Sequence, residues 1–284
     1  MKISYKRGLK LIEKNNQKLV YKIKKNNKDN LYNYLRIKDF DNFLLPLEVT
    51  QEYEVYKYID EKNIPAEDKA VELVNLLSLL HTKTTAFQEV NQEKVDEQYQ
   101  TIKKEISYLK NYYLDLQDYI EIKEFMSPAE YHLMINISKF HKALNFAEKK
   151  LELWYQEKKQ QIKERVVQLH NNITLEHFLI DDKPYFINWD KSKKDIVIYD
   201  FLNFYRNEYL NLEMSSLFEQ YQAKYQYSNE ELLLLQTLIA IPDKITFKKS
   251  NLNNLIDTKK IINYIEKTNL FLSKYYKKNQ STNS

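Results

Sequence analysis

Apolar and polar residues follow different rhythms before and after residue 60, and this contrast predicts an α+β chain. The first sixty residues contain short mixed runs separated by polar turns, which is typical of strands. Only residues 28–38 place apolar side chains at helical spacing there. We therefore expect a small β-rich N-lobe over residues 1–60, with one helix and a turn at 15–17. Its expected strands are 8–12, 18–24, 43–47 and 53–59.

Beyond residue 65 the apolar residues recur every three or four positions, which indicates helices. Two capping boxes, at 127–130 and 228–231, mark helix starts. We expect a large, mainly helical C-lobe over residues 61–276, including a helical-hairpin insertion at about 91–160. The polar residues 277–284 are expected to form a disordered tail. The first expected helix follows Pro65 and carries a broad apolar stripe over 71–80, so it should be well buried. The later ones are 95–125, 128–160, 201–221, 232–241 and 252–276.

A different pattern interrupts the helices between Val166 and Arg206. A short apolar run ends at His170 and is followed by a polar loop. Two more short runs, 178–180 and 185–189, predict a hairpin closed by a turn that ends near Pro184. A second polar loop, 190–195, leads into a helix that begins near Asp200. Two polar loops beside one hairpin point several side chains into one cleft.

This stretch resembles the catalytic core of the aminoglycoside phosphotransferase and choline kinase superfamily, and in particular its spore-coat kinase-like branch. Those proteins carry a loop H-x-D-x-x-x-x-N, a hairpin, an I-D-[FLW]-[DEG] motif and an Asp that opens a helix. His170 matches the loop histidine, residues 187–190 match the metal motif, and Asp200 matches the last Asp. The resemblance implies a bilobal protein-kinase-like fold. It also implies that Lys22 is the phosphate-binding lysine and that Tyr58 borders the adenine pocket.

Several positions depart from the family pattern. Asn172 stands where the family has its catalytic Asp, His177 where it has a metal-binding Asn, and Asn188 where it has the principal magnesium-binding Asp. An amide cannot accept a substrate's proton, and it is a weaker magnesium ligand than a carboxylate. The helix over 28–38 also lacks the glutamate that pairs with the strand lysine in the family. These departures predict a pseudokinase that acts by binding or scaffolding, with no cofactor expected.

Two other interpretations stay open. Asp190 follows Asn188 by two positions, where it either holds a metal ion or caps a turn. A divergent small-molecule phosphotransferase would keep ATP and Mg²⁺ through Lys22 and Asp190. A purely helical interaction protein would owe its kinase resemblance to chance. His170 is expected to orient the loop backbone, and its distance from other histidines argues against a zinc site with His177.

Composition excludes further classes of protein. A single glycine in 284 residues removes every glycine-rich phosphate loop, and the absence of cysteine removes thiolate chemistry. The 44 basic and 40 acidic residues nearly balance, which argues against a dedicated nucleic-acid binder. No apolar run approaches the roughly 20 residues of a membrane span, and the first residues lack a signal-peptide core. We expect a cytoplasmic protein with an unidentified protein partner or a small-molecule ligand, rather than nucleic acid or a membrane.

Overall fold

The computed structural model of the chain describes residues 2–6, 9–14, 17–25 and 28–281. The chain forms two compact units. The first comprises Met1–Ala86, Val166–Phe204 and Leu217–Tyr225, and the second comprises Phe87–Arg165, Tyr205–Ser216 and Gln226–Ser284. This grouping joins the stretch around His170 to the N-terminal residues.

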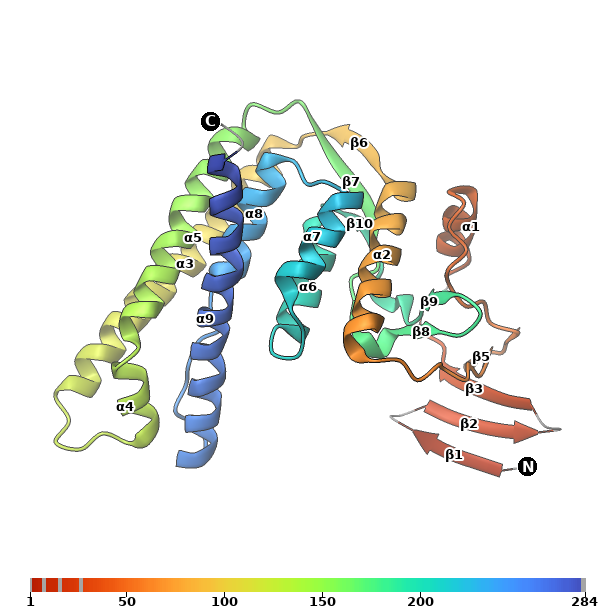
Figure 1. The fold of residues 1–284 in the computed structure, drawn as a ribbon, viewed down its shortest axis with the longest axis horizontal. Helices are drawn as coiled ribbons and strands as arrows, with labels where there is room; N and C mark the ends of the chain where they lie inside the picture. The colour runs from red at the N-terminus through yellow and green to blue at the C-terminus, as the bar shows by residue number, and fades with distance from the viewer. Residues whose placement is uncertain (1, 7–8, 15–16, 26–27, 282–284) are drawn as a thin grey trace. The chain divides into compact units, whose positions relative to one another are not determined.

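A five-stranded antiparallel sheet occupies the N-terminal part of the first unit, in the order β1-β2-β3-β5-β4 (Figure 1). It confirms the expected α+β class and contradicts the purely helical interpretation. The expected turn at 15–17 and the start of the strand at Gly8 lie partly outside the described residues. The strands are β1 (Lys2–Lys6), β2 (Leu9–Lys14), β3 (Gln17–Ile23), β4 (Glu48–Val49) and β5 (Tyr53–Lys57), and helix α1 is Asp29–Ile37.

The strand expected at 43–47 is wrong. Phe43 makes only an isolated bridge to Phe186, and regular pairing resumes at β4. Pro46 explains the interruption, because proline has no backbone N–H to donate to a strand ladder. The apolar residues Phe43, Leu44 and Leu45 gave the stretch a strand-like composition without a strand's hydrogen bonds.

Helix α2 (Ala66–Thr84) buries Leu73, Val74, Leu77 and Leu80 in the core of the first unit, as its broad apolar stripe indicates. The expected hairpin is confirmed, with β8 (Phe178–Ile180) paired to β9 (Pro184–Phe186). A second sheet has the order β10-β7-β6, formed by β6 (Ala86–Glu89), β7 (Lys163–Leu169) and β10 (Lys193–Asp195).

Strand β10 corrects the expected loop at 190–195. Its three residues, Lys193, Lys194 and Asp195, pair with β7 but carry no apolar signal. A strand of three charged residues has none of the alternation by which strands are recognised in a sequence. A 3-10 turn at Trp189–Lys191 precedes it.

The second unit is built around long helices. Helix α3 (Gln92–Glu121) runs beside α5 (Ile137–Lys158), which also packs on α8 (Asn229–Ala240) (Figure 1). The buried face of α5 repeats every three or four residues through Phe140, Leu144, Leu151 and Trp154. The capping boxes at the starts of α4 (Pro128–Met134) and α8 are both confirmed.

Two helices that were expected to be continuous are each divided at an asparagine. The expected helix 128–160 is α4 and α5, separated at Asn136, whose side-chain amide donates to the carbonyl of His132. The expected helix 201–221 is α6 (Ile198–Glu208) and α7 (Met214–Lys224), separated near Asn211, which bonds Glu208. The Asn136 side chain competes with the backbone for a helical carbonyl, which explains the first break.

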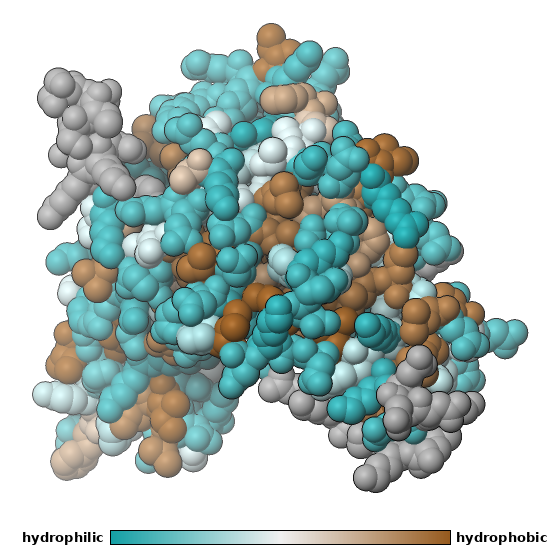
Figure 2. Space-filling view, turned by 45° about the vertical axis from the view of Figure 1, so that its right-hand side comes forward, coloured by the Kyte–Doolittle hydropathy of each residue, from teal (hydrophilic) through white to brown (hydrophobic). Residues whose placement is uncertain are grey.

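The last helix, α9 (Asn251–Ser281), extends over most of the expected disordered tail. On the face shown in Figure 2, hydrophilic residues predominate and hydrophobic ones are scattered among them, in keeping with the many charged residues. Across the described residues, every helix is too short or too polar to cross a lipid bilayer.

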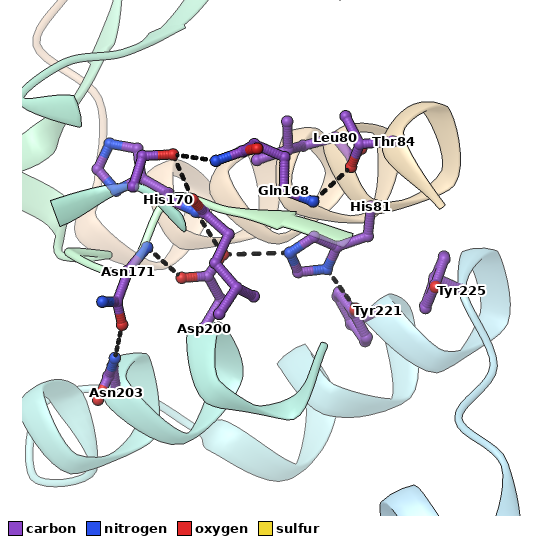
Figure 3. Close-up of polar contacts among 12 residues, drawn as sticks. Leu80, His81, Thr84, Gln168, His170, Asn171, Asp200, Asn203, Tyr221 and Tyr225 are labelled. Atoms are coloured by element: carbon purple, nitrogen blue, oxygen red, sulfur yellow. Dashed lines mark hydrogen bonds and ion pairs between the residues drawn. The ribbon is translucent and has the colours of Figure 1, made fainter. Parts of the chain in front are cut away.

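Buried Asp200, in the first turn of α6, holds the loop that follows β7. Its carboxylate accepts the backbone N–H groups of His170 and Asn171, at 2.8 and 2.6 Å, and lies 3.1 Å from His81 Nε2 (Figure 3). Asn171 has φ 58°, in the left-handed region that asparagine tolerates better than most residues. Tyr221 lies 2.6 Å from His81 Nδ1 and completes the network.

His170 itself is buried against the hairpin. Its Nε2 lies 2.9 Å from the carbonyl oxygen of Ile187, so Nε2 carries the proton in the tautomer that satisfies this bond. Its Nδ1 has no hydrogen-bond partner among the residues described. Burial lowers the pKa of His170 to about 4, so the ring is neutral at pH 7.

We expect Asp200→Asn to lower the free energy of unfolding by about 3 kcal/mol, because an amide replaces a carboxylate that accepts charge-assisted hydrogen bonds. Urea unfolding at pH 7 measures the change. The matched control is Asp118→Asn on the exposed face of α3, which should change stability by less than about 0.5 kcal/mol. Equal effects of the two substitutions would contradict the role given to Asp200.

The lowered pKa of His170 predicts a loss of stability in acid. The unfolded histidine takes up a proton below its ordinary pKa of 6.5, whereas the folded one stays neutral down to about 4. This group therefore stabilises the fold above pH 6.5, and its contribution falls by about 2 kcal/mol between pH 7 and pH 5. Denaturant unfolding at both pH values should show a smaller loss for His170→Gln, which keeps a donor but does not titrate. An identical loss in both proteins would contradict the prediction.

Candidate ligand-binding site

A cavity of about 710 Å³ lies within the first unit, a volume typical of small-molecule sites. The sheet, the segment from Tyr58 to Lys69 and the β8–β9 hairpin supply its walls. Lys22, Lys28, His177 and Asn188 also line it. The apolar and aromatic part of the lining consists of Leu11, Val20, Tyr32, Leu44, Tyr56, Tyr58, Ile59, Ile64, Ala66, Leu175, Leu179, Ile187 and Trp189.

Lys22 on β3 connects the sheet with the residues that follow the hairpin. Its Nζ donates to Asn188 Oδ1 at 2.8 Å and forms an ion pair with Asp190 Oδ2 at 2.8 Å. The Lys22 side chain is 20% exposed and that of Asp190 is 10% exposed. Lys22 is therefore partly buried between two polar partners and does not point freely into solvent.

Lys28 is a second cation at the same carboxylate. Its Nζ lies 2.9 Å from Asp190 Oδ1, and it donates to both oxygens of Glu54 at 3.0 and 3.2 Å. Tyr56 donates to Glu54 as well, at 2.8 Å. Lys28 occupies the N-cap of α1, where the helix dipole disfavours a positive charge. The two carboxylates compensate this cost.

Each charged group of this cluster keeps its partners ionised. Burial alone would lower the pKa of Lys28, but its bonds to Asp190 and Glu54 outweigh burial and raise it. Burial alone would likewise raise the pKa of Asp190, but the bonds from Lys22 and Lys28 lower it. Lys28 and Asp190 are therefore both ionised at neutral pH.

A second chain of hydrogen bonds starts from Lys22 and runs through neutral groups. Asn188 Nδ2 lies 3.0 Å from His177 Nε2, and His177 Nδ1 lies 2.9 Å from the backbone oxygen of Asn172. A carbonyl only accepts, so His177 Nδ1 carries the proton, and Nε2 accepts from the amide of Asn188. Every donor in the chain therefore points from Lys22 toward Asn172.

Backbone geometry explains why asparagine fits at position 188. Its φ is 65° and its ψ is 54°, in the left-handed region that asparagine and aspartate tolerate better than most other residues. Asparagine in place of aspartate at this position keeps the backbone, removes the charge and provides the N–H donor that His177 Nε2 accepts.

The residues at the expected metal position do not fit Mg²⁺. Asn188 Oδ1 is bound to Lys22, His177 Nε2 is bound to Asn188, and both oxygens of Asp190 face ammonium groups. Magnesium prefers one or two carboxylates with open coordination sites. Nowhere in the described part of the chain do three His, Cys, Asp or Glu side chains come together to hold a metal ion.

The structure brings most of the predicted site residues together. Four of them line the cavity: Lys22, Tyr58, His177 and Asn188. Asp190 does not line it but forms ion pairs with two lysines that do. Asn172 and His170 are joined to this group by backbone contacts, Asn172 through its own oxygen and His170 through the oxygen of Ile187.

Sequence reasoning missed Lys28 and Glu54. A signal for Glu54 was present, because an acid between the apolar residues of a strand needs a cationic partner. The register of β3 on β5 places Glu54 opposite Lys22, but this register was not evident from the sequence. Glu54 supplies a carboxylate near the strand lysine that α1 itself does not provide.

No family model matches the sequence, and no curated protein matches it. Among solved structures, an aminoglycoside phosphotransferase from Alicyclobacillus acidocaldarius is similar, with a TM-score of 0.70 and 11% identity. The match covers 98% of this chain and 92% of that one. A spectinomycin phosphotransferase in an AMP-bound complex has a TM-score of 0.55 and 14% identity, over 92% and 90% of the two chains.

A choline kinase from Streptococcus pneumoniae also matches, at 12% identity and a TM-score of 0.44, over 96% of this chain and 92% of that one. The spore-coat kinase-like branch and the loss of catalysis stay predictions, because identities this low concern the fold alone. The chain therefore has an α+β fold like that of the aminoglycoside phosphotransferase from Alicyclobacillus acidocaldarius.

Proposed function

We propose that this protein is a pseudokinase: a kinase-fold protein that no longer transfers phosphoryl groups and acts by binding a small molecule or scaffolding a partner. The observation that carries the proposal is the hydrogen-bond chain from Lys22 through Asn188 and His177 to the oxygen of Asn172. Beyond its lysine this chain consists of neutral groups, and two of its residues, Asn172 and Asn188, stand where the family has aspartates.

Phosphoryl transfer needs a group that positions or deprotonates the acceptor, and positive charge on the transferred phosphate. The amide of Asn172 cannot accept a proton. His177 has one free lone pair in the tautomer required here, and the Asn188 amide occupies it. Asp190, the carboxylate two residues after Asn188, serves as the counter-ion of two lysines.

The cavity still suits a ligand. Its apolar lining accommodates a planar ring, and Lys22 and Lys28 provide positive charge beside it. A phosphotransferase of similar fold was solved in an AMP-bound complex, which supports a purine nucleotide as the first compound to test.

The second candidate is a divergent phosphotransferase that keeps ATP and Mg²⁺ through Lys22 and Asp190. The position of Asp190 beside a cavity-lining lysine favours it. Thermal unfolding with ATP, in the presence and absence of magnesium, distinguishes this candidate from the pseudokinase. A ligand at 100 times its Kd stabilises the native state by about 2.7 kcal/mol. Stabilisation that appears only with magnesium would favour the phosphotransferase.

We expect no ATP hydrolysis by the parent protein beyond that of a Lys22→Met variant. The triple variant Asn172→Asp, His177→Asn, Asn188→Asp restores the three family residues and is expected to gain hydrolysis in magnesium. His177 is included because its Nε2 lone pair would otherwise face the new carboxylate at position 188. Release of phosphate measures the activity.

A matched control is Asn269→Asp, which adds a carboxylate on an exposed position of α9 and should stay inactive. Hydrolysis by the parent at the rate of the triple variant would refute the pseudokinase. A well-folded triple variant without any gain would count against a kinase-like placement of the three positions.

A further inference from the structure

Asp190 occupies the place that the anion of a ligand would take between two ammonium groups. Its Oδ1 lies 2.9 Å from Lys28 Nζ and its Oδ2 lies 2.8 Å from Lys22 Nζ. Two oxygens of a phosphate group can bridge two cations in the same way. Both lysines line the cavity, so an anion inside it meets the same pair of charges.

The two lysines are held unequally. Lys28 keeps both oxygens of Glu54 in addition to Asp190, and its side chain is only 6% exposed. Lys22 has Asp190 and the neutral Asn188 as its partners, and its side chain is 20% exposed. An entering anion therefore displaces Asp190 most readily from Lys22, while Asp190 keeps its contact with Lys28.

The same cluster offers little to a divalent cation. The carboxylates of Asp190 and Glu54 both bind ammonium groups. The oxygen of a third residue nearby, Asn188 Oδ1, is bound to Lys22. A metal ion would have to take these oxygens from lysines and would leave the lysines without counter-ions in a partly buried site. An anion instead exchanges one counter-ion of Lys22 for another.

We propose that the cavity binds a phosphate-bearing ligand without a divalent cation, and that the ligand's anion competes with Asp190 for Lys22. The inference rests on the proposed function, because it concerns the ligand of the same cavity. It assigns Asp190 the role of an internal competitor, whereas the second candidate function makes Asp190 a metal ligand.

Calorimetric titration tests the inference with ADP, and with pyrophosphate as a probe of the anion alone, each in EDTA and in magnesium. We expect Asp190→Asn to bind both probes about tenfold more tightly than the parent, because the competing carboxylate is gone. Lys22→Gln should lose the binding. Asp182→Asn, at an exposed position of the hairpin turn, should leave it unchanged. Magnesium should not strengthen binding by the parent.

Weaker binding by a folded Asp190→Asn variant, or binding that requires magnesium, would overturn the inference. Failure of both probes to bind the parent and Asp190→Asn would overturn it as well. If Asp190→Asn does not fold, the comparison of the parent with and without magnesium, together with Lys22→Gln, still decides. Phosphate release by the parent refutes the proposed function through a separate measurement, so the two failures are distinguishable.

Discussion

Two lysines and two carboxylates neutralise one another at the centre of this site, and the remaining features depend on that balance. Lys28 and Glu54 are almost fully buried, and Asp190 and Lys22 only slightly less so. Removing one member of a buried ion pair typically costs about 3–5 kcal/mol, because its partner is left without a counter-charge. The carboxylates are therefore committed to the lysines. The ion cluster holds the sheet, the start of α1 and the residues after the hairpin together, and it removes the acids from chemistry.

The loop that follows β7 is fixed by buried hydrogen bonds. Asp200 ties the loop at His170 and Asn171 to the first turn of α6, and it joins them to His81. The buried, neutral ring of His170 then bonds the carbonyl of Ile187 next to Asn188. These contacts are structural, since they fix backbone positions and require no metal ion.

The sequence predicted the local features of this site and missed those that depend on strand register. The hairpin, the capped helices and the order of His170, Asn188 and Asp200 follow from short patterns, because each depends on neighbouring residues. The contact of Lys28 with Glu54 depends on how β5 pairs with β3, and Asp190 reaches both lysines only after the hairpin folds back. Asn136 divides a helix. Because the chain contains many asparagines, an asparagine at this position gave no warning of a break.

Asn188 has a consequence for how such proteins arise. The left-handed backbone at this residue admits asparagine and aspartate alike, and the two side chains have nearly the same shape. Their codons differ by a single base. At this position a lineage can exchange a charged oxygen for a neutral nitrogen, or reverse the exchange, while the backbone conformation stays the same. A comparison of backbone shape alone will therefore group proteins that have asparagine at this position with enzymes that have aspartate there.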